Sequence, residues 1–267
     1  MNRIDQRFTA LRAAGQKGFI AYIGAGDPNL AATEQLALAF DKAGVDVLEL
    51  GVPFSDPLAD GLVNQLAAQR GLASGTTPPK VLECVAAIRR QSQIPIVLYI
   101  YFNLIHQRGL EAFIRDTAAA GVDGLLVLDL PPEEAAEYER LMKAHGLCAV
   151  WLIAPTTPEA RVRTIVQRGS GFIYYVSREG VTGMQQTVSG GIGDMLALIR
   201  RHSALPVAVG FGVSNAQQAR AVAAQSEAVV VGSAIVNQIA EHGSDAHMPQ
   251  RVAGFVKTLV DAVKNGG

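Results

Sequence analysis

Three carboxylates lie close together in the segment VLELGVPFSDPLADG at residues 47–61. Glu49 falls inside an apolar run with the composition of a core strand, and Asp56 and Asp60 follow in a stretch with proline and glycine. A carboxyl group withdrawn from water has a raised pKa, so it can both donate and accept a proton near neutral pH. The segment therefore predicts acid–base chemistry at a strand end. The structural alternatives are an ion pair for Glu49, a helix N-cap for Asp60 and an ordinary turn for Asp56.

Other side chains that commonly carry catalysis are missing from the expected strand ends. None of the six lysines ends an expected strand, which disfavours a Schiff-base mechanism. The five histidines form no metal-binding set, and no serine or cysteine occupies a nucleophile turn. Asp129, by contrast, closes an expected strand at the same level as Glu49. The sequence thus predicts carboxylate chemistry without a metal or a cofactor in this chain.

Eight short, apolar, β-branched runs recur along the chain, and helix-like stretches rich in alanine separate them. The expected strands are residues 18–23, 45–50, 94–100, 124–129, 147–153, 171–176, 206–210 and 228–232. Such strands pair in parallel, with the helices covering the outside. The pattern predicts an α/β fold, a single (β/α)8 TIM barrel over residues 1–267. We expect an extra N-terminal helix and an inserted helix at 63–74, after the second strand.

An open doubly wound sheet is the alternative fold. Its dinucleotide-binding fingerprint is missing, because GAGDPN has Asn29 where the third glycine would stand, and there is no P-loop. In a barrel, Val45, Val47 and Glu49 share one face of the second strand, since side chains alternate in direction. Small branched valines suit the barrel interior. We therefore expect Glu49 to point inward at the C-terminal mouth, where barrels of this kind hold their active sites.

Three glycine-rich loops follow strands six, seven and eight, at residues 177–183, 210–214 and 231–236. Glycine lets backbone N–H groups approach an anion, and the last loop opens a short helix whose N-terminus attracts phosphate. Together the loops predict a phosphate site, whereas each alone would be only a tight turn. Residues 182–194 are rich in glycine and serine and predict a mobile lid, or alternatively a plain surface loop.

Aromatic side chains gather near the expected strand ends and indicate a pocket for a flat, apolar part of a substrate. They are Tyr22, Tyr101, Phe102, Tyr174, Tyr175 and Phe211.

Composition excludes several classes of protein. The formal net charge of −1 gives no sign of a nucleic-acid or membrane-surface binder. The N-terminus is too charged for a signal peptide, and no apolar run is long enough to cross a bilayer. Cys84 and Cys148 lie in apolar surroundings, as buried thiols do in a reducing compartment. We expect a cytoplasmic protein.

These residues together resemble the alpha subunit of tryptophan synthase. The most specific segment is LELGVPFSDPLADG, and GDP, YFN, DLP, GFIYYVSREGVTG, VGFGVS and VVGSAIV occur at family-like spacing. The resemblance covers nearly the whole chain. It implies a (β/α)8 barrel that cleaves indole-3-glycerol phosphate to indole and glyceraldehyde 3-phosphate in tryptophan biosynthesis.

The resemblance implies roles for individual residues. Glu49 would be the proton-transferring carboxylate, and Asp60 would hold the indole N–H. Thr182 would meet Asp60 as the lid closes, and Arg178 would help to order the lid. The expected substrate-binding residues are Tyr22, Tyr101, Asp129, Tyr174, Thr182, Gly183, Phe211, Gly212, Gly232 and Ser233, among which Gly183, Gly212, Gly232 and Ser233 would hold the phosphate.

A partner is also implied. In the family a β subunit holds pyridoxal phosphate, and the two kinds of chain form an α2β2 heterotetramer. Pro53, Phe54 and Asp56 would lie near that interface, and this chain itself would bind no cofactor.

Some residues depart from the family pattern. Leu62 replaces a proline, which loosens the loop that carries Asp60, and Asn64 puts an amide where an aliphatic side chain usually packs. Three alternatives therefore stay open: a stand-alone lyase, a weakly catalytic barrel that acts as an allosteric partner, and a different phosphate-binding barrel such as an isomerase.

Overall fold

The chain forms a closed barrel of parallel strands. The computed structural model describes residues 1–177, 189–210 and 212–265. Within them each strand pairs with the next along the chain, and the last returns to the first, which confirms the predicted (β/α)8 architecture. The strands are β1 Gly18–Gly24, β2 Val47–Gly51, β3 Ile96–Ile100, β4 Gly124–Val127, β5 Cys148–Ile153, β6 Ile173–Val176, β7 Val207–Gly210 and β8 Ala228–Val231.

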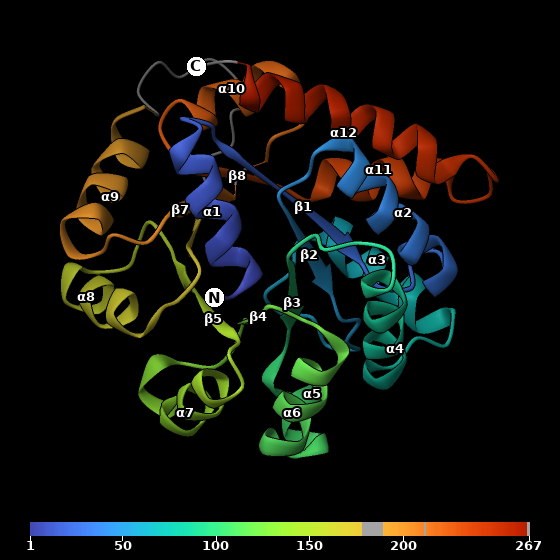
Figure 1. Ribbon diagram of the computed structural model, residues 1–267, viewed down its shortest axis with the longest axis horizontal. Coiled ribbons are helices and arrows are strands. Elements are labelled where there is room, and N and C mark those ends of the chain that lie inside the picture. The colour runs from blue at the N-terminus through green and yellow to red at the C-terminus, as the bar shows by residue number, and fades with distance from the viewer. Residues whose placement is uncertain (178–188, 211, 266–267) are drawn as a thin grey trace.

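Helices surround the strands (Figure 1). They are α1 Arg3–Ala13, α2 Leu30–Ala43, α3 Leu62–Ala73, α4 Pro78–Arg89, α5 Phe102–Arg108, α6 Leu110–Ala120, η1 Pro132–Glu134, α7 Ala136–Ala144, α8 Glu159–Arg168, α9 Ser189–His202, α10 Ala216–Ala223, α11 Ser233–His242 and α12 Met248–Lys264. The expected N-terminal helix is α1, and the expected helix after the second strand is α3. Both predictions are confirmed.

Two expectations of the sequence are wrong in detail. Val45 does not point into the barrel, because it belongs to the turn that ends α2, where its N–H donates to Phe40 O at 3.0 Å. It packs with the helices outside the strands. The expected lid at 182–194 is helical from residue 189 onward, in α9. Residues 178–188 lie outside the described residues.

The barrel is closed at its N-terminal end by α1. Its apolar side chains Ile4, Phe8 and Leu11 join one buried cluster with interior side chains such as Val47 of β2. The rings of Phe8 and Phe172 lie 5.7 Å apart. Apolar packing thus fills the barrel interior at this end, whereas barrels of this kind hold their active sites at the opposite, C-terminal end.

Carboxylates bind neighbouring strands together at the same N-terminal end. Each stands just before an even-numbered strand and accepts a backbone N–H from the preceding odd-numbered strand. The pairs are Phe19 N to Asp46 at 2.7 Å, Ile96 N to Asp123 at 2.8 Å and Val207 N to Glu227 at 3.0 Å. Arginines neutralise these carboxylates: Arg7 contacts Asp46, Arg89 contacts Asp123 and Arg200 contacts Glu227. This repetition fixes the start of the strands in register.

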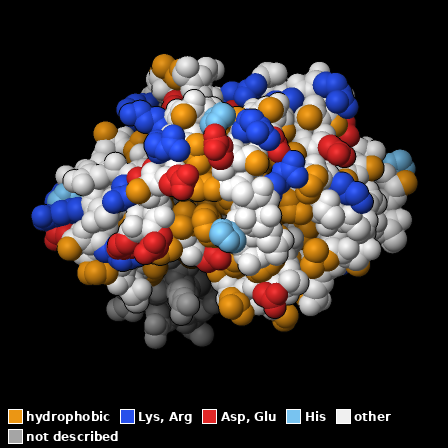
Figure 2. Space-filling view, turned by 90° about the horizontal axis from the view of Figure 1, so that it is seen from below, with side chains coloured by type: hydrophobic (Ala, Val, Ile, Leu, Met, Phe, Trp, Pro, Cys, Tyr) orange, Lys and Arg blue, Asp and Glu red, His pale blue; other side chains and the backbone are white. Residues whose placement is uncertain are grey.

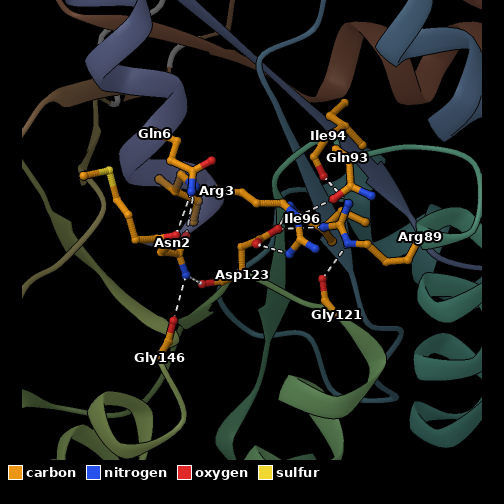
Figure 3. Close-up of polar contacts among 12 residues, drawn as sticks. Asn2, Arg3, Gln6, Arg89, Gln93, Ile94, Ile96, Gly121, Asp123 and Gly146 are labelled. Atoms are coloured by element: carbon orange, nitrogen blue, oxygen red, sulfur yellow. Dashed lines mark hydrogen bonds and ion pairs between the residues drawn. The ribbon is translucent and has the colours of Figure 1, made fainter.

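Asp123 has the fullest set of partners (Figure 3). Its carboxylate accepts from Arg3 at 2.9 Å and from Arg89 at 2.6 Å, as well as from the backbone of Ile96. Asn2 adds a hydrogen bond from its amide to the Asp123 carbonyl at 2.7 Å. The network therefore joins the N-terminal segment to α4, β3 and β4.

Charges of both signs are mixed on the outside of the barrel. Figure 2 shows one side, on which basic and acidic side chains are interspersed with hydrophobic ones. That face presents no extended area of a single charge.

We expect Asp123→Asn to lower the free energy of unfolding by about 3 kcal/mol, since it leaves the buried Arg89 guanidinium without its counter-ion. Urea unfolding followed by circular dichroism measures the change. Asp116→Asn is the control, because Asp116 pairs with Arg108 and Arg115 at the exposed surface. That variant should stay close to the parent, and an equal loss in both would contradict a special role for the Asp123 network.

Candidate active site

Glu49 lies at the centre of the C-terminal mouth. It pairs in register with Tyr22 on one side and with Val97 on the other, and it is only 1% exposed. Neither carboxylate oxygen has a hydrogen-bond partner among the described residues. Burial, and secondarily the charge of Asp60, raise the pKa of Glu49 from 4.5 to about 8. The group can therefore exchange a proton near neutral pH.

Asp60 is held by two phenols. Tyr99 donates to Oδ1 and Tyr101 donates to Oδ2, each at 2.7 Å. Asp60 is not the N-cap of α3, because Gly61 occupies that position without a side-chain cap. The helix N-cap, which was the structural alternative for Asp60, is therefore not observed. The carboxylate is fixed in the loop between β2 and α3 and faces the same mouth as Glu49.

Tyr99 is a site residue that the sequence reading missed. Alternation along β3 places it on the inward face with Val97, and that signal could have found it. Burial, with the charge of Asp60 next, raises the pKa of Tyr99 well above its ordinary value. The hydroxyl therefore stays protonated and remains a donor.

Tyr22 of β1 and Tyr174 of β6 both line the mouth, and glycines make room for both rings. A Cβ on Gly51 would lie 2.4 Å from the Tyr22 hydroxyl, and one on Gly210 would lie 2.6 Å from the Tyr174 hydroxyl. Burial first, and then the charges of Asp60 and Glu49, raise the pKa of Tyr22. The pKa of Tyr174 is raised mainly by burial, with Glu49 next.

Two other aromatic candidates turn away from the mouth. Tyr175 alternates with Tyr174 and is buried among the helices outside the barrel, and Phe102 packs against the same outer cluster. Phe211, Arg178, Thr182 and Gly183 lie outside the described residues.

The mouth encloses a cavity of about 1000 Å³. Among the residues predicted from the sequence, it brings together Tyr22, Glu49, Asp60, Asp129, Tyr174, Gly212, Gly232 and Ser233. Tyr101 stands behind Asp60 and lines a smaller cavity beside it.

The phosphate-binding prediction falls on one wall of this cavity. Gly232 is the N-cap of α11, and Ser233 is the first residue of that helix. Gly212 lies on the neighbouring loop, and a Cβ there would meet no atom of the described residues within 4 Å. The wall therefore has free space in front of a helix N-terminus, where an anion is favoured.

Asp129 has a clear structural partner. Its carboxylate accepts the backbone N–H of Phe102, the first residue of α5, at 2.6 Å. It is exposed at the rim of the cavity.

The predicted interface segment is connected to the site. Pro53 is buried, Asp56 is exposed, and the Phe54 ring lies 5.1 Å from the ring of Tyr101, which donates to Asp60. A displacement of Phe54 would therefore reach the Asp60 carboxylate through one side chain.

An ion pair that the sequence reading missed fixes α3 below this loop. Asp27 lies in the turn after β1, where its N–H donates to Gly24 O at 3.3 Å. It is 1% exposed and accepts two hydrogen bonds from Arg70 of α3, both at 2.7 Å. The cap of α2 is Asn29. Nothing in the spacing of Asp27 and Arg70 could have shown this contact.

Within the described ranges, no group of three or more His, Cys, Asp or Glu side chains is arranged to hold a metal ion. No helix in those ranges is long and apolar enough to cross a membrane.

The fold and the mouth define a class: a (β/α)8 barrel whose C-terminal mouth holds a buried glutamate and the N-terminus of a helix in one cavity. The family model of the tryptophan synthase alpha chain matches residues 8–264. The tryptophan synthase alpha chain of Opitutus terrae is 52% identical, over 99% of this chain and 100% of that protein. That of Geobacter sulfurreducens is 47% identical over the same shares. The solved tryptophan synthase subunit alpha from Legionella pneumophila is 36% identical, with a TM-score of 0.92 over 99% of each chain.

The chain belongs to the tryptophan synthase alpha chain family. It is accordingly a lyase of tryptophan biosynthesis.

We expect Glu49→Gln to change the pH dependence of stability. In the parent, the folded-state pKa of Glu49, about 8, exceeds the ordinary value of 4.5. The contribution of Glu49 to the free energy of unfolding is therefore fully present below pH 4.5 and is lost as the pH rises through 8. Glutamine ionises in neither state. The variant's free energy of unfolding relative to the parent should therefore grow by about 3 to 5 kcal/mol between pH 4.5 and pH 8.5. Urea unfolding at both pH values measures it, and a constant difference would show that Glu49 has an ordinary pKa.

Proposed function

We propose that Glu49 and Asp60 carry out the cleavage of indole-3-glycerol phosphate to indole and glyceraldehyde 3-phosphate in the mouth of the barrel. The observation that carries the proposal is the contrast between the two carboxylates. Glu49 is buried without a hydrogen-bond partner among the described residues, and its pKa is raised to about 8, while Asp60 is fixed by two phenols. Different environments give two carboxylates different tasks.

Glu49 first acts as an acid. The neutral carboxyl donates its proton to C3 of the indole ring, and the ring becomes an iminium cation. The resulting carboxylate then takes the proton of the hydroxyl on the adjacent side-chain carbon. The bond between that carbon and C3 breaks, its electron pair returns to the ring, and the aldehyde forms. The cycle neither gains nor loses a proton, because Glu49 is protonated at its end, as it was at its start.

Asp60 stabilises the cation. The positive charge develops at the ring N–H, and a fixed carboxylate that faces this group interacts more strongly with the cation than with the neutral substrate. Tyr99 and Tyr101 hold each oxygen of Asp60 in place, so little reorganisation is needed at the moment of reaction. Tyr22 and Tyr174 would enclose the ring itself.

The substrate phosphate would bind at the opposite wall, at Gly212, Gly232 and Ser233, where the N-terminus of α11 favours an anion. Gly183, Thr182, Arg178 and Phe211 would complete this wall and the closure over the substrate. Asp129 would lie at the rim, where it caps α5.

The partner would be a β subunit that holds pyridoxal phosphate, in an α2β2 heterotetramer. A set of exposed leucines on the loop after β2 and on α3, here called the apolar patch, supports a docking surface close to Pro53, Phe54 and Asp56. It consists of Leu58, Leu62, Leu66 and Leu72, which are 93%, 69%, 43% and 39% exposed. Exposed clusters of large apolar side chains mark sites of protein association.

Activity of two variants tests the chemistry. We expect Glu49→Gln to lower kcat about 10²- to 10⁴-fold, since it removes the proton-exchanging group. Asp60→Asn should also lower kcat strongly, because an amide does not stabilise the cation. Indole release from indole-3-glycerol phosphate is measured with and without a β subunit. Binding of glycerol phosphate serves as the control and should be unchanged in both. Retained turnover would reject the assigned roles.

Binding to a β subunit tests the apolar patch. We expect Leu62→Glu to weaken the affinity at least about tenfold, since the charge would be buried in the interface. The variant should fold, because residue 62 is the first of α3 and an acidic side chain is favourable there. Ala10→Glu places the same charge on an exposed position of α1 and is the control. Equal affinities in a titration would place the interface elsewhere.

A further inference from the structure

The side-chain amide of Asn64, in α3, is a polar group that the proposed chemistry does not use. Its side chain makes no hydrogen bond with the described residues, and its Oδ1 is buried without a partner. Buried amide oxygens are nearly always satisfied, by protein or by an ordered water. Asn64 lines the same cavity as Glu49 and Asp60, so the explanation of its unpaired oxygen belongs to the site.

A second, smaller cavity lies beside Asn64, under the loop that carries Asp60. Its volume is about 10 Å³, which is the room that one water molecule needs. Its polar lining comes from Tyr22, Asp60, Asn64, Tyr99 and Tyr101. A cavity of this size and polarity meets the conditions for an internal water, provided that two to four hydrogen-bonding groups face it.

The polar groups that line the small cavity could make the hydrogen bonds of one water molecule. The Tyr22 hydroxyl donates to no described residue, and it stands over Gly51, which lines the same cavity. Asp60 accepts one bond on each oxygen and keeps further lone pairs. A water here would accept from Tyr22 and donate to Asn64 Oδ1 and to Asp60. All three polar groups would then be satisfied.

We propose that one water in this small cavity joins Tyr22 and Asn64 to the Asp60 carboxylate, and that both side chains act as positioning residues for Asp60. The inference rests on the proposed role of Asp60. Tyr99 and Tyr101 hold the carboxylate from β3 and from the residue after it. The water adds a link to β1 through Tyr22 and to α3 through Asn64. Asp60 is thereby fixed from two opposite sides although it lies in a loop.

A double-mutant cycle tests the link. Tyr22→Phe removes the hydroxyl that donates to the water, and Asn64→Leu removes the acceptor while filling a similar volume. We expect each variant to lower kcat about tenfold with little change in KM, because a less well fixed Asp60 stabilises the cation less. The double variant should be about as slow as either single variant, since both changes break one shared link. Gln69→Leu, on an exposed position of the same helix, is the control and should behave as the parent.

Several results would overturn the proposal. Effects that multiply in the double variant would mean that the two side chains act separately. A raised KM with an unchanged kcat would mean that Asn64 contacts the substrate directly. A high-resolution crystal structure of the parent must show a water within hydrogen-bond distance of Tyr22, Asn64 and Asp60. This measurement decides the matter even if Asn64→Leu fails to fold.

The outcomes separate this proposal from the proposed function. Suppose that Glu49→Gln and Asp60→Asn lose turnover, while the effects of Tyr22→Phe and Asn64→Leu multiply in the double variant. Those results would reject only the water link. Retained turnover in those two variants would reject the function on which the link rests.

Discussion

The burial of a carboxyl group without a partner is the constraint to which the rest of the mouth is fitted. Glu49 stands in the wall of the barrel, where it is only 1% exposed and no described cation neutralises it. The charged form is disfavoured there, so a proton stays on the group at pH values where an ordinary glutamate has lost it. This arrangement is destabilising for the fold and useful for catalysis. The surrounding structure has to hold it in place.

The carboxylates at the strand starts differ from Glu49 and Asp60 in their partners. At the N-terminal end, Asp46 and Asp123 accept backbone N–H groups and pair with arginines, so each charge is satisfied within the protein. At the C-terminal end, Glu49 and Asp60 have no arginine or lysine beside them among the described residues. The strand starts are thus held by satisfied carboxylates, whereas Glu49 and Asp60 keep their charge or proton available for a ligand.

The sequence predicted the fold well because its signals are local. Apolar runs, helix caps and glycines repeat along the chain, and alternation along β2 sufficed to turn Glu49 inward. One error is local and one omission concerns a contact between distant residues. Val45 belongs to the turn that ends α2, where the alternation of β2 has not begun. The ion pair of Asp27 was missed, because its partner Arg70 lies on an inserted helix whose placement no local pattern gives.

The site shows the same division. Glu49 and the glycines of the predicted phosphate site follow from strand ends and loop order. Tyr99 and Asn64 acquire meaning only when the loop after β2 folds back over β3 and α3 is placed against β1. Tyr99 could have been found because side chains alternate along β3 and Val97 points inward, but its hydrogen bond to Asp60 could not have been predicted. Placing an Asp on a loop requires several fixed neighbours, because a loop alone does not hold a carboxylate in one orientation. Much of what makes Asp60 a precise group therefore lies in residues whose individual sequence signals are weak.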